Sequence, residues 1–384
     1  MQVVQTFSSI KAHGTGEDWY RLLNLDPNKN SSILTVYKCN ENDIQTIKNY
    51  LQSSNLKDEQ SLIESFIDYC YQLDPYDKDS NHDLINGFLQ KLFPLVLKNT
   101  MFIKTFKSGI LFALKLELID ANHILRFFNM LKNTCSTNEM KDLLLFLGNL
   151  LIKTYLELNL IICKNIFTNL NTLNLDYRSF NKRKILIYKM NLSRYYLYKN
   201  SLIQCFRNVQ WCLLNCLNID VLALFLPLSI MLGRRIKFSY LRSVYRGDLV
   251  DFYEKVSICV HNGDLQGFNQ LVDNRKDNEM ILKLLKTKCF ILIIRNLFFK
   301  VFRIVNNHNI SFNYLKTALN FVKFKNNDMI IENLLVSLID QNLIKGKILP
   351  NSRSLVLSKV NPFPKVFDVY KTFDARDDFW LSDL

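Results

Sequence analysis

KLLKTKCFILIIRNLFFKVFRIVNNH, residues 283–308, begins the stretch of sequence that decides the fold. Two further segments with helical spacing of their apolar residues follow it, SFNYLKTALNFV at 311–322 and DMIIENLLVSLIDQNL at 328–343. Two short runs of β-prone character come next, IKGKIL at 344–349 and SLVLSK at 354–359. This order predicts three helices followed by a β-hairpin.

The predicted hairpin has a turn at Pro350-Asn351-Ser352-Arg353, because Pro and Asn interrupt the chain between two extended runs. The apolar residues of the third helix recur at spacings of three and four, which places them on one face: Ile331, Leu334, Leu335, Leu338 and Ile339. Three helices followed by a hairpin is the order of a winged helix, a relative of the helix-turn-helix. We therefore expect a winged-helix module here.

Three strings in this region resemble the PCI domain, the module with a C-terminal winged helix found in the proteasome lid and the signalosome. They are RNLFFKV at 295–301, LLVSLIDQNLIKGK at 334–347 and LVLSKVNPFP at 355–364. Within that family the chain resembles the branch of signalosome subunit twelve and its paralogue in an mRNA-export complex. The resemblance covers roughly the last half of the chain well and the first third poorly.

Composition predicts a mainly α-helical protein. Of 384 residues, 48% are hydrophobic, while only 10 are Gly and 7 are Pro. Because no apolar run reaches 18 residues, a membrane span is not expected. We expect a right-handed superhelical array of helix pairs similar to tetratricopeptide repeats, ending in the PCI winged helix and its small hairpin.

The expected organisation has four parts. An N-terminal helical segment occupies 1–80, a helical repeat array 81–275, the PCI winged-helix domain 276–364 and a tail 365–384. The array is clearest at 190–216, MNLSRYYLYKNSLIQCFRNVQWCLLNC, where two helices flank a Lys-Asn-Ser turn.

Charge is unevenly distributed along the chain. Residues 1–90 hold 7 Lys and Arg against 13 Asp and Glu, so the totals of 49 and 35 leave 42 and 22 for residues 91–384. This basic body favours a polyanionic partner, either nucleic acid or a strongly acidic protein, although a merely solvated basic surface is a third interpretation.

Motifs for catalysis or metal binding are scarce, which favours a non-enzymatic protein with no cofactor and no metal. The five His are isolated in sequence, and no HExxH, P-loop or GxGxxG occurs. Cys212 and Cys216 would be neighbours on a helix, but nothing nearby completes a ligand set, so we interpret them as core residues. Nine scattered Cys without a spacing pattern suit a reducing compartment.

The resemblance implies a scaffold subunit that pairs with a second PCI-domain protein through the winged helix. The residues predicted for that pairing are Leu335, Leu338, Ile339, Leu355 and Leu357. We expect Lys345, Lys347 and the segment 355–358 to offer a strand edge that a partner could extend. Non-specific contact with RNA or DNA is a second, compatible hypothesis. It rests on six cations, three on the long helix and three on the wing: Arg295, Lys300, Arg303, Lys345, Lys347 and Arg353.

The family branch leaves two complexes open. We favour the signalosome, which removes a ubiquitin-like modifier from cullins, because the LSKVNPFP string is kept and no long insertion interrupts the array. The alternative is the mRNA-export complex at the nuclear pore. Either assignment implies a second, very small acidic subunit of the kind found in the proteasome lid, and a location in the nucleus and cytoplasm.

Overall fold

The computed structural model describes residues 23, 45, 49, 62–68, 78–135, 137–172, 180–245, 247–275 and 279–372. Chain contacts divide the protein into two compact units, Met1–Asn191 and Leu192–Leu384, and helix α11 contributes residues to both. Most of the predicted N-terminal segment and the last twelve residues of the predicted tail lie outside the described residues.

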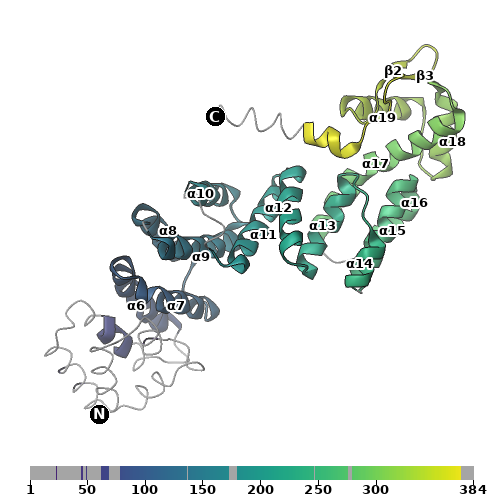
Figure 1. The fold of residues 1–384 in the computed structure, drawn as a ribbon. Coiled ribbons are helices and arrows are strands. Elements are labelled where there is room, and N and C mark those ends of the chain that lie inside the picture. The colour runs from purple at the N-terminus through teal and green to yellow at the C-terminus, as the bar shows by residue number, and fades with distance from the viewer. Residues whose placement is uncertain are drawn as a thin grey trace. The chain divides into compact units, whose positions relative to one another are not determined.

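The first unit is built of helices in its described part (Figure 1). Sequential helices pack as neighbours: α6 on α7, α8 on α9 and α9 on α10. Their bounds are α6 Lys78–Lys98, the 3₁₀ turn η1 Thr100–Phe102, α7 Ile103–Lys115, α8 Ala121–Thr134, α9 Asn138–Tyr155, α10 Leu160–Asn171 and α11 Lys182–Tyr198. The sequence predicts a succession of helices here.

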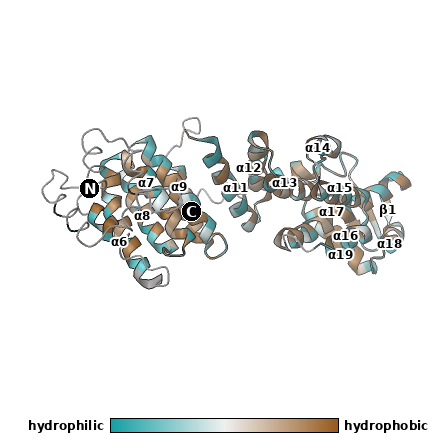
Figure 2. Cartoon of the chain, turned by 90° about the horizontal axis from the view of Figure 1, so that it is seen from below, coloured by the Kyte–Doolittle hydropathy of each residue, from teal (hydrophilic) through white to brown (hydrophobic). Residues whose placement is uncertain are grey.

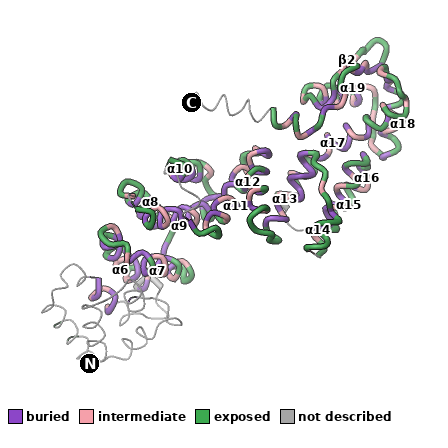
Figure 3. The backbone as a smooth tube through the Cα atoms, in the orientation of Figure 1, coloured by how far each residue is buried: buried purple, intermediate pink, exposed green. Residues whose placement is uncertain are grey.

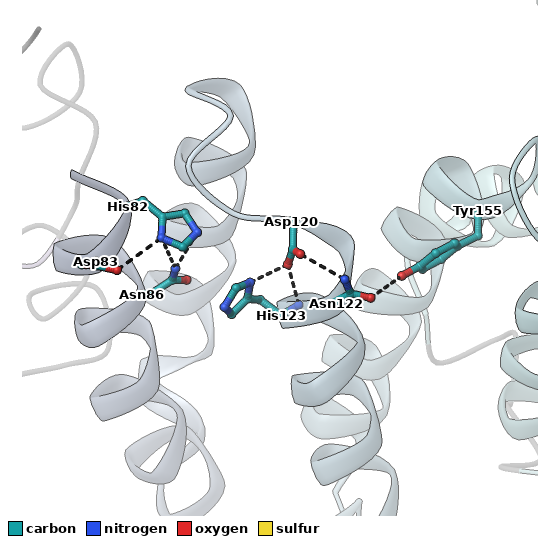
Figure 4. Close-up of polar contacts among 7 residues, drawn as sticks. All are labelled: His82, Asp83, Asn86, Asp120, Asn122, His123 and Tyr155. Atoms are coloured by element: carbon teal, nitrogen blue, oxygen red, sulfur yellow. Dashed lines mark hydrogen bonds and ion pairs between the residues drawn. The ribbon is translucent and has the colours of Figure 1, made fainter. Parts of the chain in front are cut away.

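A polar network around the start of α8 ties three of these helices together (Figure 4). The Asp120 carboxylate caps the helix by accepting the backbone N–H of His123 at 2.9 Å, and it also contacts Nδ1 of His123 at 2.5 Å. Asn122 donates to Asp120 and accepts from the hydroxyl of Tyr155 on α9. The ring of His82 on α6 lies edge-on to that of His123, with centroids 5.6 Å apart. Burial acts to raise the pKa of Asp120, but the hydrogen bonds from His123 and Asn122 outweigh it and lower that pKa.

The second unit continues with helix pairs and ends in a small sheet. Asn200, with φ of 60°, makes the turn between α11 and α12, where the sequence predicts one. The elements of this unit are α12 Leu202–Asn215, α13 Ile219–Met231, α14 Phe238–Val244, α15 Asp248–Asn262, α16 Leu265–Asp273, α17 Glu279–Val305, β1 Asn309–Ser311, α18 Phe312–Phe321, α19 Asp328–Asp340, β2 Gly346–Leu349 and β3 Ser354–Leu357. Residues 366–372 are also helical.

Helix α17 is the centre of this unit, because α13, α15, α16 and α18 all pack against it. Its middle is buried on nearly every side: Leu285, Cys289, Leu292, Ile293 and Ile294 are each at most 1% exposed (Figure 3). Gly263, with φ of +71°, lets the α15–α16 turn approach closely, since a Cβ there would lie 2.9 Å from the backbone of Leu297. Helix α13 is buried along most of its length as well, whereas helices such as α8 and α15 alternate hydrophobic and hydrophilic residues (Figure 2).

The sheet has three antiparallel strands in the order β1-β3-β2. The predicted hairpin is β2 and β3, and the turn between them contains Arg353 with φ of 46°. Strand β1 pairs Ile310 with Leu355, so β3 is bonded on both sides. The expected strand edge is therefore wrong for 355–357, because Leu355 and Leu357 belong to the central strand, whereas Lys347 does lie on an outer strand, β2. The outer strands are β1 and β2.

The mainly helical fold with a small sheet in the C-terminal region is confirmed. The three helices and the hairpin lie where the sequence predicts them, while the strand β1 was not anticipated. The hand of the helical array and the domain boundaries at 80, 275 and 364 stay predictions. Among the helices in the described ranges, none has both the length and the apolar character needed to cross a membrane.

A substitution in α19 tests the predicted register of this helix. Leu335 is 0% exposed, so Leu335→Asp places an unpaired carboxylate in the core and should lower the free energy of unfolding by about 3–5 kcal/mol. The adjacent Val336 is 52% exposed, and Val336→Asp should change it by less than about 0.5 kcal/mol. Urea denaturation of both variants measures these free energies of unfolding. Equal values would show that Leu335 is not on the buried face of α19.

Candidate nucleic-acid and partner interface

A basic groove lies in the second unit, between the C-terminal end of α13, α15, α17 and the segment 363–368. Its volume is about 1130 Å³. Its wall contains six cationic side chains and one histidine: Arg234, Arg235, Arg295, Lys300, Arg303, Lys365 and His261. The groove thus gathers cations from segments that are far apart in sequence.

Arg295 is the one cation of this groove that is buried, at 9% exposure. Its Nε donates to the carbonyl of Leu343 at 3.3 Å, and Nη2 donates to the carbonyl of Pro364 at 2.6 Å. Nη1 donates to Asn296 at 2.9 Å, and the guanidinium lies over the ring of Phe363. Burial lowers the pKa of Arg295 to about 10, so it is still charged near neutral pH. Because Arg295 is buried and its nitrogens donate to Leu343, Asn296 and Pro364, it holds these segments together and does not present its charge to nucleic acid.

Arg234 is held at the rim of the groove by two aromatic rings. Its Cζ lies 5.0 Å from the ring centre of Phe206 and 4.5 Å from that of Phe367. The preceding Gly233 has φ of +65°, and a Cβ there would lie 2.7 Å from Val366. These contacts seat the helical segment 366–372 against the end of α13, so that it forms one wall of the groove.

The remaining cations of the groove are exposed. Within the described residues, Arg235, Arg303 and Lys365 make no ion pair, and the Lys300 ammonium donates to the side chain of Asn262 at 3.4 Å. Burial lowers the pKa of His261, and the positive charges of Arg235 and Lys300 lower it further. Those two cations therefore face the same space, and they make it electropositive.

The three predicted cations of the wing lie on a different part of the second unit and do not line the groove. Lys345 precedes β2 and Lys347 is in it, and both are exposed. Arg353 is 73% exposed and forms an ion pair of 3.1 Å with Asp328, which also binds Lys316 at 3.1 Å. The predicted nucleic-acid residues therefore form two groups. Lys345, Lys347 and Arg353 are exposed on the wing, and Lys300 and Arg303 are exposed on α17. Arg295 belongs to neither group, because it is buried.

The residues predicted for partner contact mostly form the core of the winged helix. Leu335, Leu338 and Leu355 are 0% exposed and Leu357 is 3% exposed, while Ile339 is half-buried. Because a surface contact needs exposed atoms, these leucines support the fold instead. The outward face of α19 presents Met329 and Val336, which are 72% and 52% exposed, and β2 presents Leu349 at 44%.

The described part of the chain contains no group of three or more His, Cys, Asp or Glu placed to hold a metal ion. Cys212 is buried and Cys216 is exposed, so the pair predicted to be two core residues is half correct. Burial raises the pKa of Cys163 to about 11, and it also raises the pKa values of Cys205 and Cys289. Buried thiols of this kind are poor nucleophiles near neutral pH.

Sequence reasoning missed Arg234, Arg235, His261 and Lys365 as members of a site. The one local signal was the doubled arginine directly after Gly233, which ends a helix. Their approach to Lys300 depends on how α13, α15 and α17 pack, which no spacing in the sequence shows.

Comparison with known proteins agrees with this description of the C-terminal region. Residues 270–359 match the PCI domain, from the end of α16 through β3. A PCI domain-containing protein of Schizosaccharomyces pombe is 26% identical over 268 residues, covering 62% of this chain and 58% of that protein. A PCI domain-containing protein 2 homolog of Drosophila melanogaster is 32% identical over 152 residues, covering 38% of this chain and 37% of that protein.

The nuclear mRNA export protein THP1 of Saccharomyces cerevisiae is 25% identical over 248 residues, covering 53% of this chain and 54% of that protein. These alignments span between about a third and three fifths of the relatives' lengths. The winged helix that closes a helical unit is the architecture of a PCI module. Residues 270–359 are therefore a PCI domain, and the chain as a whole is similar to a PCI domain-containing protein 2 homolog and to THP1.

The structural role of Arg295 can be tested by its removal. Arg295→Ala leaves two backbone carbonyls without their donor and should lower the free energy of unfolding by about 2–4 kcal/mol. Arg303→Ala, on the same helix but exposed, should change it by less than about 0.5 kcal/mol. Urea denaturation measures both, and an Arg295→Ala protein as stable as Arg303→Ala would contradict the role assigned to Arg295.

Proposed function

We propose that this chain is a non-catalytic scaffold subunit of an mRNA-export complex. The observation that carries the proposal is the PCI match at 270–359 together with the similarity to a protein named for nuclear mRNA export. The name of that relative supports a nuclear location for the complex.

We propose pairing with a second PCI-domain protein through the outward surface of the winged helix. The outer strands β1 and β2 carry backbone groups that a partner strand could extend. The exposed Met329 and Val336 of α19 offer apolar contact area. Helix α19 contains no Lys or Arg, which favours a protein contact over readout of duplex bases by this helix.

We also propose weak, non-specific contact with nucleic acid, and association with a small acidic subunit of the proteasome-lid type. Both partners are polyanions, and both suit the excess of 20 positive charges in residues 91–384. Cations that contact phosphate position a ligand and read little sequence, so the contact should be insensitive to base order.

The relatives favour the export assignment over the signalosome assignment expected from the sequence. Among the three relatives described above, one is named for mRNA export and none for the signalosome. The LVLSKVNPFP string, which supported the signalosome assignment, includes part of β3 and the Phe363 ring under Arg295. The string therefore has a role in the fold, so its presence does not distinguish the signalosome from the mRNA-export complex.

Affinity purification of the native chain, followed by identification of its partners, tests this assignment. We expect a second PCI-domain protein and mRNA-export factors, and we expect Met329→Asp to reduce recovery of the PCI partner because it charges an exposed apolar contact. Lys153→Glu, an exposed change in the first unit, is the control. Recovery of signalosome subunits instead, or of no PCI protein, would contradict the proposal.

The contribution of the wing to nucleic-acid binding is measured by salt dependence. Changing Lys345, Lys347 and Arg353 to Glu should weaken binding of a single-stranded RNA. It should also flatten the slope of log affinity against log salt by roughly 0.7 for each phosphate that the wing no longer neutralises. An unchanged slope would exclude the wing from the binding surface.

A further inference from the structure

We propose that the basic groove between α13, α15 and α17 is a binding track for single-stranded nucleic acid. Its exposed cations would hold the phosphates and Phe299 would stack on a base. This inference rests on the proposed nucleic-acid contact and names a surface for it that is separate from the wing.

The charge of the groove is not balanced from within. Its lining has six cations and two carboxylates, Glu254 and Asp368. Glu254 is already paired with Arg242, which lies outside the groove. Burial lowers the pKa of His261, and the nearby positive charges of Arg235 and Lys300 lower it further. A bound polyanion would offset the repulsion among the cations of the groove, and its binding would release the polyanion's own counterions.

The fold explains two of these cations but not the rest. Arg295 holds two backbone carbonyls and Arg234 is stacked on Phe206 and Phe367, so both have structural roles. Arg235, Lys300 and Arg303 are exposed, and none of them binds a carboxylate of the described residues. These three side chains are therefore available to a ligand.

An aromatic side chain distinguishes this groove from a purely electrostatic patch. Phe299 lines it at 36% exposure, one residue before Lys300 and four before Arg303. Its ring meets that of Phe363 edge-on, with centroids 5.1 Å apart, so its position is fixed. A positively charged groove with a fixed, accessible ring is the arrangement that binds single strands, since every base has a face that can stack.

The occupant could otherwise be an acidic protein segment, which would use the same cations. A contact with the ring of Phe299 distinguishes nucleic acid from an acidic protein segment, because only nucleic acid has bases that stack on the ring. A polyanion that lacks bases, such as a heparin oligosaccharide, would report the electrostatic part alone. We therefore test charge and stacking with different variants and different probes.

The first measurement is fluorescence anisotropy of the full chain with a 20-nucleotide single-stranded RNA across a salt series. The groove variant changes Arg235, Lys300 and Arg303 to Glu. The control variant changes the exposed Arg126, Lys153 and Lys164 of the first unit to Glu, and has the same net charge. We expect the groove variant to weaken binding at least tenfold and to flatten the salt slope by about 2, from roughly 0.7 for each of three phosphates. We expect the control to change affinity less than threefold.

The second measurement uses Phe299→Leu, which keeps apolar packing against Phe363 but removes the ring. It should weaken RNA binding about fivefold and leave heparin binding unchanged. If RNA and heparin are affected equally, or neither is affected, the base contact is wrong and the groove fits an acidic protein segment instead.

The outcomes also separate this inference from the proposed function. If the wing variant loses RNA binding but the groove variant behaves like its control, the nucleic-acid contact stands and the groove is excluded. If the unaltered chain shows no salt-dependent RNA binding, both are overturned. Melting temperatures within a few degrees of the unaltered chain confirm that the variants are folded.

Discussion

The buried guanidinium of Arg295 is the interaction on which the C-terminal module depends. Its two backbone acceptors, Leu343 and Pro364, flank the β2–β3 hairpin, one before β2 and one after β3. One side chain of α17 therefore fixes both ends of the hairpin to the central helix. The two bonds leave from different nitrogens of one planar guanidinium, Nε and Nη2, an arrangement that the single nitrogen of a lysine ammonium does not have.

The position of a cation along α17 decides what it does. Arg295 is buried and donates to the carbonyls of Leu343 and Pro364, so its guanidinium holds the protein's own backbone. Lys300 and Arg303 lie five and eight residues further on, where the helix emerges toward solvent, so their charges face outward. The same helix thus supports the winged helix at one point and, in the function proposed here, contacts a polyanion at another.

Sequence alone predicted the elements of this module well, because local spacing determines them. Ile331, Leu335 and Leu338 recur on the helical period and are the buried residues of α19. Strand β1 was missed because three residues between two helices carry no period of their own, and only pairing with β3 defines the strand. The roles of Arg295 and Lys300 could not be separated in advance, because both lie in one run, RNLFFK, and burial depends on tertiary packing. The groove was missed for the same reason.

The central claim is that the exposed face of α17 contacts nucleic acid. Ultraviolet crosslinking of the full chain to a uridine-rich single-stranded RNA, with mass-spectrometric mapping of the crosslinked peptides, tests it most directly. The account predicts crosslinks at Phe299 or Phe363, which lie in the groove beside the exposed cations. Crosslinks confined to the wing or to residues 78–191, with none on α17 or at Phe363, would contradict it.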